Sequence, residues 1–298
     1  MNRSADATPA ASGNRRVAPG IAAAAALLAA VLALAGCSGL GNLSSSDKDD
    51  ALAANTQPNL ASLTEVIQKH PEDPQAYNMR GSVLAEAGRA ELALADFNKA
   101  ISLDRNYAQA YANRALLYRQ NGKPELALTD YNKALSIDAS YAPAYLGRGI
   151  IYREQGRTVQ ALGDFNKAIA LRPDNAQAYY NRGLLYQGQH QHQFAIDDFS
   201  TAMGLTNHKA EPYVARALSY LAVGDVKSAA SDLDQAVQIA PQSVQAWTSR
   251  GLAYERLGQK GKAAGSYAKA LNINDKYEPA RTGFARVGGK VGQSYETF

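Results

Sequence analysis

A motif that recurs every 34 residues constrains the fold of this chain more than any other feature. Small residues stand at equal intervals, at Gly81, Ala115, Gly149, Gly183, Ala217 and Gly251. If each copy is numbered from Pro74, these residues hold position 8, and alanine holds positions 20 and 27 of every copy. Six copies follow one another without an insertion, which predicts a repeat array whose core grows along one dimension.

The spacing within each copy predicts two helices. Positions 4, 8 and 11 share one face of a first helix, and positions 20, 24 and 27 share one face of a second. Small residues at positions 8, 20 and 27 let the two helices approach, while large residues, mostly aromatic, at positions 4, 11 and 24 fill the surrounding space. Glycine at position 15 of five copies predicts a turn between the helices, and Pro173 and Pro241 predict the end of a second helix.

These framework positions resemble those of the tetratricopeptide repeat over residues 74–277. The resemblance implies an all-α fold, a right-handed α-solenoid of six helical hairpins. Their predicted bounds are 74–107, 108–141, 142–175, 176–209, 210–243 and 244–277. Incomplete repeats predict an N-terminal capping helix at 59–73 and a C-terminal capping helix at 278–288, followed by a loose tail at 289–298.

The first 58 residues indicate an export signal and a tether. Residues 1–36 are basic and then apolar, which is typical of a signal peptide. The string Leu34-Ala35-Gly36-Cys37 resembles the lipobox of bacterial lipoproteins, which implies a lipid on Cys37, the chain's only cysteine. An uncleaved transmembrane anchor is the alternative, because about 20 apolar residues can span a bilayer. Residues 37–58 are rich in small and polar residues, which predicts a flexible tether. In enterobacterial lipoproteins Asp after the cysteine favours inner-membrane retention, so Ser38 favours the outer membrane.

Arginine at position 7 and aspartate at position 23 recur in parallel. This recurrence predicts ion pairs that fix the packing of the two helices. The central candidates are Arg114 with Asp130, Arg148 with Asp164, and Arg182 with Asp198. A basic ladder for an anionic polymer is the alternative. In the last repeat Ser266 replaces the aspartate, so Arg250 is left to pair with Asp232 or with nothing.

The tetratricopeptide resemblance implies that positions 2, 5, 9, 12 and 13 of the first helices line a concave protein-binding groove. The candidate groove residues are Arg119, Leu146, Ile150, Arg153, Tyr180, Leu184, Gln187, Val214, Leu218 and Leu252. Tyr180 is the candidate for the largest single contribution, because the other repeat tyrosines hold framework positions. The alternative is that helix packing partly covers position 9.

The rest of the sequence gives little indication of nucleic-acid binding, metal binding or catalysis. A net charge of +4 gives no reason to expect nucleic acid as a partner. His190 and His192 could bind a metal, but no third ligand is apparent, and a polar turn is the simpler interpretation. The sequence contains no nucleophile–base arrangement or phosphate-binding loop, so no enzyme activity, cofactor or metal is expected.

A lipobox, a short tether and a repeat array together resemble NlpI-type adaptor lipoproteins of the bacterial cell envelope. The resemblance implies a membrane-anchored scaffold that binds envelope proteins or peptide segments, on the outer membrane facing the periplasm. Two alternatives are a pilotin-like assembly factor for a pilus or secretion machine, and a regulatory subunit that presents substrates to an enzyme. The oligomeric state is left open.

Overall fold

The computed structural model describes residues 59–206, 209–290 and 292–295. The predicted signal peptide, the tether and Cys37 lie outside these residues. Within the described ranges, no helix is both long enough and apolar enough to cross a membrane.

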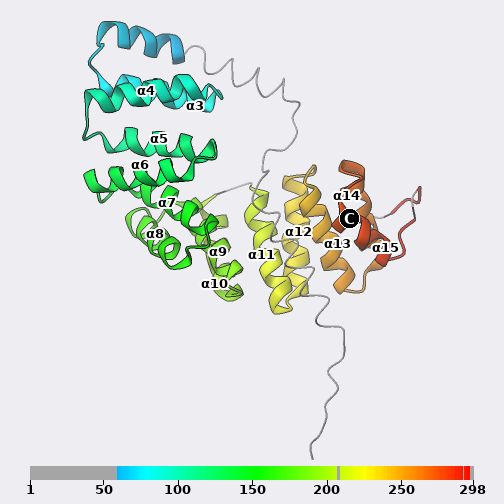
Figure 1. Ribbon diagram of the computed structural model, residues 1–298. Helices are drawn as coiled ribbons and strands as arrows, with labels where there is room; N and C mark the ends of the chain where they lie inside the picture. The colour runs from blue at the N-terminus through cyan, green and yellow to red at the C-terminus, as the bar shows by residue number, and fades with distance from the viewer. Residues whose placement is uncertain (1–58, 207–208, 291, 296–298) are drawn as a thin grey trace, which may run out of the picture. The chain divides into compact units, whose positions relative to one another are not determined.

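Fourteen helices and no strands form the described part of the chain, which confirms the predicted all-α fold of paired helices (Figure 1). A first helix covers residues 59–69. The helices of repeats one to three are α3 Pro74–Glu86, α4 Ala90–Leu103, α5 Ala108–Gln120, α6 Pro124–Ile137, α7 Ala142–Glu154 and α8 Thr158–Leu171. The later ones are α9 Ala176–Gly188, α10 His192–Leu205, α11 Ala210–Val223, α12 Val226–Ile239, α13 Val244–Arg256, α14 Lys260–Ile273 and α15 Glu278–Arg286.

Each repeat is an antiparallel hairpin that packs on its neighbours. The first helix of a repeat packs along its own second helix, as α7 does on α8, and the second helix packs on the first helix of the next repeat. First helices of successive repeats also touch one another, as α5, α7 and α9 do. Every hairpin therefore depends on the next one to cover its second helix.

Small residues set the distance between the two helices of a hairpin. The alanines at position 20 are fully buried in all six repeats. A Cβ atom added to Gly183 would lie 2.7 Å from Cε1 of Phe199, well inside van der Waals contact. The glycine at position 8 therefore lets the aromatic ring at position 24 lie against the backbone of the first helix.

The turn between the two helices requires a left-handed backbone at position 15. Glycine adopts this conformation in five repeats, with φ between 69° and 88°. In repeat four the same position is His190, with φ at 59°. A side chain makes this conformation costly, by about 1–2 kcal/mol. His190 is therefore a turn residue under local strain.

His190→Gly is expected to raise the free energy of unfolding by about 1 kcal/mol, because the left-handed conformation costs glycine little. The matched control is Gly156→His, which places the same strain at the same position of repeat three, where nothing lies within 4 Å of the added Cβ. It should lower stability by a similar amount. Urea denaturation measures both changes, and a less stable His190→Gly variant would contradict this account.

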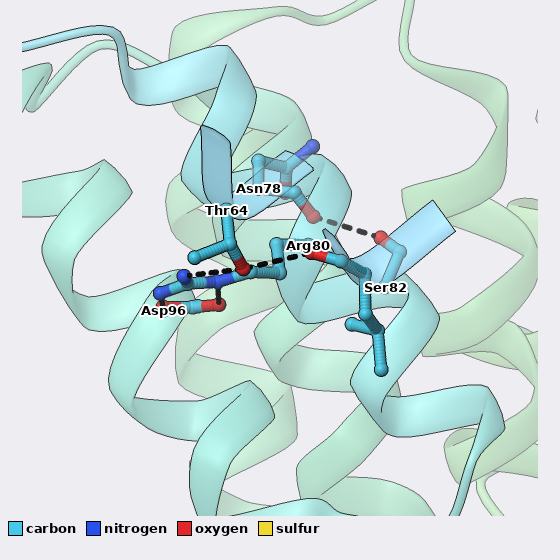
Figure 2. Close-up of polar contacts among 6 residues, drawn as sticks. Thr64, Asn78, Arg80, Ser82 and Asp96 are labelled. Carbon is cyan, nitrogen blue, oxygen red and sulfur yellow. Dashed lines mark hydrogen bonds and ion pairs between the residues drawn. The ribbon is translucent and has the colours of Figure 1, made fainter. Parts of the chain in front are cut away.

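Arginine at position 7 binds aspartate at position 23 in each of the first five repeats, and we call this series the Arg–Asp ladder. Its pairs are Arg80–Asp96, Arg114–Asp130, Arg148–Asp164, Arg182–Asp198 and Arg216–Asp232. In the first pair Arg80 Nε donates to Asp96 Oδ2 at 2.7 Å and Nη2 donates to Oδ1 at 2.8 Å (Figure 2). Such two-point contacts hold the first helix to the second within a hairpin.

The third contact of each ladder arginine crosses to the preceding hairpin. Nη1 donates to a side-chain oxygen at position 25 of that hairpin, as Arg80 does to Thr64 at 3.3 Å (Figure 2). The other acceptors are Asn98, Asn132, Asn166 and Ser200. Tyrosines at positions 4 and 11 flank the guanidinium, and the Tyr145 and Tyr152 ring centroids lie 5.6 and 5.8 Å from Arg148 Cζ. These internal contacts favour the structural interpretation of the series.

Arg250 in the last repeat departs from both predicted alternatives. Its Nε donates to Asp234 Oδ1 at 2.7 Å, and its Nη1 donates to Ser266 Oγ at 2.7 Å. The carboxylate that binds Arg250 is thus at position 25 of repeat five, whereas the ladder arginines bind a carboxylate at position 23 of their own repeat. The prediction that Arg250 pairs with Asp232 or with nothing is therefore wrong, because Asp232 is held by Arg216.

The ladder ends at the C-terminal cap. Position 7 of that incomplete repeat is Phe284, and position 25 of repeat six is Ala268, so neither residue of the next polar contact is present. The Tyr295 ring packs on Phe284, with centroids 5.7 Å apart, and its hydroxyl accepts a hydrogen bond from the Lys290 backbone at 2.5 Å. Within the predicted tail, Tyr295 therefore contacts the C-terminal helix α15.

Candidate functional site

The candidate binding surface is formed by positions 5, 9 and 12 of α5, α7, α9 and α11, and we call it the first-helix face. Its side chains differ widely in exposure. Leu146, Tyr180, Leu184, Arg119 and Arg153 are half-buried. Leu252, the predicted groove residue on α13, is also half-buried. This part of the surface is open to a partner.

Four of the predicted groove residues contribute little open surface. Ile150, Val214 and Leu218 are buried, and Gln187 is 2% exposed. The Gln187 amide nitrogen donates to the Ala215 carbonyl and to Ser219 Oγ, both at 2.8 Å, so it joins α9 to α11. The prediction of Gln187 as a groove contact is corrected. Because α9 and α11 pack closely, the Gln187 amide nitrogen bonds within the chain and is buried between the two helices. Partial coverage of position 9 by packing, the stated alternative, applies to Ile150 and Leu218.

Tyr180 is part of the packing as well as the surface. Its ring centroid lies 5.7 Å from that of Phe199, and it borders the core cluster of Ala195, Phe199 and Ala215. Burial raises the pKa of the Tyr180 hydroxyl. Tyr180 therefore contributes to the packing of the hairpin, and substitution by alanine would disturb the core together with any binding.

The most open apolar residue of the face is not among the predicted groove residues. Leu116, at position 9 of α5, is 40% exposed. Leu146 on α7 and Leu184 on α9 continue the apolar strip through the next two repeats. The open part of the first-helix face therefore lies on repeats two to four, whereas repeat five closes it with buried Val214 and Leu218.

Two arginines border this apolar strip at position 12. The Nε atoms of Arg119 and Arg153 are buried and have no hydrogen-bond partner. The one ion pair formed by Arg153 is a long contact of 3.9 Å to its neighbour Glu154. Burial lowers the pKa of the Arg153 guanidinium, and the nearby charge of Arg119 lowers it further, against opposing effects of Glu154 and Tyr180. Among the described residues, the face thus presents positive charge that no close ion pair neutralises.

Repeat one carries a polar version of the same positions. Asn113 Nδ2 donates to Asn78 Oδ1 at 3.0 Å and to Ser82 Oγ at 3.3 Å. Asn78 Nδ2 in turn donates to the Tyr107 hydroxyl at 3.3 Å. These side chains satisfy one another across α3 and α5, so the apolar strip ends there.

The two histidines of repeat four lie close together at the turn. Their ring centroids are 5.9 Å apart, and burial lowers the pKa of His192. In the described part of the chain, no three His, Cys, Asp or Glu residues gather as metal ligands would. The arrangement accords with the interpretation of His190 as a turn residue.

Sequence profiles of known families match most of the array. A TPR repeat profile matches residues 81–122 and 149–189, and two tetratricopeptide repeat profiles match residues 108–141 and 214–279. Together these matches cover more than half of the chain. No curated protein matches the chain significantly.

Solved structures show the same fold. YrrB, described as a TPR protein with an unusual peptide-binding site, is 26% identical, with a TM-score of 0.54 over 62% of this chain and 96% of that one. PilF of Pseudomonas aeruginosa is 21% identical, with a TM-score of 0.66 over 72% of this chain and 98% of its own. A chain of the APC/C hetero-tetramer Cut9–Hcn1 is 19% identical, with a TM-score of 0.68 over 80% of this chain. The present chain spans only 48% of the length of that protein. With the profile matches and the stacked hairpins, these likenesses show that the chain belongs to the tetratricopeptide repeat family.

Proposed function

We propose that this protein is a membrane-anchored scaffold of the bacterial cell envelope that gathers envelope proteins on its first-helix face. A lipid on Cys37 attaches it to the outer membrane, and residues 37–58 hold the repeat array away from the lipid surface. Several acyl chains make such attachment stable, whereas a single chain binds only weakly. This location rests on the lipobox-like string before the chain's only cysteine.

The observation that carries the binding role is the open apolar strip on α5, α7 and α9. Leu116 is 40% exposed, and the half-buried Leu146 and Leu184 follow on the first helices of the next two repeats. An apolar strip bordered by charge suits an extended or helical peptide segment. The peptide-binding site described for YrrB supports the same use of this fold.

Leu116→Gln is expected to weaken capture of the physiological partner by about tenfold, roughly 1.4 kcal/mol, because it removes the most open apolar contact. Stability should change little, since substitutions of exposed residues usually cost less than about 0.5 kcal/mol. The measurement is quantitative crosslinking and affinity capture from intact envelopes, with partners identified by mass spectrometry.

The matched control is Leu126→Gln, because Leu126 is 49% exposed in the same repeat but lies on the second helix, α6. It should leave capture unchanged. A second control deletes residues 288–298. If either control abolishes capture while Leu116→Gln binds normally, the partner uses another surface and the first-helix face is not the binding site.

An assembly factor for a pilus or secretion machine is the second candidate. It rests on the combination of lipobox and repeats, and the likeness to PilF, at 21% identity, supports the shared fold alone. The same capture experiment separates the two candidates. Recovery of pilus or secretion subunits would favour the assembly factor, and recovery of cell-wall enzymes or proteases would favour the scaffold.

A further inference from the structure

The buried Nε atoms of Arg119 and Arg153 are unusual within the described part of the chain, because they have no hydrogen-bond partner there. All five arginines of the Arg–Asp ladder make three side-chain hydrogen bonds each, as Arg148 does with Asp164 and Asn132. Within the described ranges, the only other buried side-chain nitrogen or oxygen that lacks a partner is His192 Nδ1. A buried donor without a partner destabilises the folded state, and the effect is larger for a charged group. Two such donors on adjacent helices need an explanation beyond packing.

Other polar residues at position 12 find partners inside the chain. Gln187 in repeat four bonds to Ala215 and Ser219. Glu255 in repeat six accepts hydrogen bonds from Arg286 and from the Tyr267 hydroxyl. Arg119 and Arg153 differ because, within the described ranges, neither has a close carboxylate partner, and the ion pair of Arg153 with Glu154 is a long contact of 3.9 Å.

The site of Glu255 shows what this position can hold. Tyr267 at position 24 lies against Gly283 at position 6 of the next helix, where an added Cβ would come within 2.3 Å of the Tyr267 ring. Burial would raise the pKa of Glu255, but hydrogen bonds from Arg286 and Tyr267 lower it overall. A carboxylate and a guanidinium therefore sit together beside a tyrosine at this place in the repeat.

The junction of repeats two and three has the same arrangement, but position 12 holds a guanidinium in place of the carboxylate. Tyr131 at position 24 lies against Gly147 at position 6, where an added Cβ would lie 2.3 Å from the Tyr131 hydroxyl oxygen. Burial raises the pKa of Tyr131 to about 12, although the charge of Arg119 and a hydrogen bond from the Arg119 side chain act to lower it. The Nε atom of Arg119 is still without a partner. Position 12 here is Arg119, and position 9 of the next helix is Ile150 in place of Arg286. The guanidinium is present and the carboxylate is missing.

We propose that Arg119 and Arg153 form a subsite for an aspartate or glutamate side chain of the bound partner segment. The proposal rests on the proposed function, since it names the chemistry of the segment that the first-helix face binds. Apolar residues of the segment pack on Leu116 and Leu184 on either side of the acidic residue. The Arg153 side chain is 28% exposed, so a ligand can reach it from solvent.

Short synthetic peptides test this subsite on the full chain, purified in detergent. The probe is acetyl-Gly-Leu-Glu-Leu-Glu-Leu-Gly-amide, and its match carries Gln in place of both Glu residues. A third peptide has the Gln sequence with a free C-terminal carboxylate. The Glu peptide is expected to bind at least about tenfold more tightly than the Gln peptide, measured by fluorescence anisotropy with labelled peptides. Arg119→Gln and Arg153→Gln should each remove most of this difference.

The stability of the variants provides the second readout. Arg153→Gln should leave the melting temperature unchanged or raise it, because it removes an unsatisfied buried charge. The matched control Arg148→Gln, on the same helix, should lower the melting temperature while the folded variant still prefers the Glu peptide. If Arg153→Gln destabilises the protein as much as Arg148→Gln does, Arg153 is structural and the proposal is wrong.

The binding outcomes separate this proposal from the proposed function. Equal binding of the Glu and Gln peptides overturns the carboxylate subsite and leaves peptide binding by the face intact. Preference for the free-carboxylate peptide overturns the assignment to a side chain and indicates capture of a chain terminus. If no peptide binds, the subsite fails, and the proposed function then depends on the Leu116→Gln capture experiment alone.

Discussion

Asp234→Ala is expected to lower the free energy of unfolding by about 3 kcal/mol, because it leaves the Arg250 guanidinium buried without its carboxylate. Arg250 is 1% exposed, and removal of one member of a buried ion pair typically costs about 3–5 kcal/mol. The Tyr254 hydroxyl, which donates to Asp234 at 2.8 Å, loses its acceptor as well. The ring centroid of Trp247, the only tryptophan of the chain, lies 5.5 Å from Arg250 Cζ. Trp247 fluorescence during urea denaturation therefore reports unfolding near Arg250.

The matched control is Asn166→Ala, which changes the same position 25 in repeat three. In this variant Arg182 keeps its two hydrogen bonds to Asp198, so the free energy of unfolding should fall by less than about 1 kcal/mol. Ser266→Asp added to Asp234→Ala should restore most of the lost stability, because it returns the carboxylate to its usual position. Equal, small effects of Asp234→Ala and Asn166→Ala would contradict the view that Asp234 replaces the ladder aspartate.

Cys37→Ser is expected to abolish lipid attachment and signal cleavage, because it removes the thiol that we propose receives the lipid. Metabolic labelling with a palmitate analogue should show no incorporation, and the product should run at the size of the uncleaved chain. Ser38→Ala is the control, since it changes the neighbouring residue and keeps the thiol, and it should be labelled and cleaved normally. A normally cleaved and acylated Cys37→Ser product would refute the lipobox interpretation.

The regular parts of the fold could be predicted because each contact repeats at a fixed offset. Arg148 and Asp164 lie 16 residues apart within one hairpin, and the same offset joins every pair of the ladder. A recurring offset between charges of opposite sign on two adjacent helices is enough to identify such partners. The helical hairpins follow from the same regularity, since small residues recur wherever two helices must touch.

The contacts between repeats were harder to predict. Gln187 is buried because α9 and α11 pack closely enough for its amide to reach Ser219, and no local pattern reports that distance. The partner of Arg250 was missed for a different reason. Side-chain oxygens recur at position 25, from Thr64 to Asp234, and this signal was present in the sequence. The aspartates at position 23 do not by themselves show that the carboxylate can come from position 25 of the neighbouring hairpin.

The contacts at the junctions also govern which repeats could be lost or exchanged by recombination. Excision of residues 142–175 would place Asn181 where Gly147 makes room for the Tyr131 hydroxyl. Excision of 210–243 would leave Arg250 facing Ser200 and Ser266, with no carboxylate. Excision of 176–209 meets neither obstacle, because Phe165 would face Ala215, as Phe199 does now, and Arg216 would face Asn166 in place of Ser200. The boundaries thus restrict the order of the repeats: they oppose the removal of repeat three or of repeat five, and they permit the removal of repeat four.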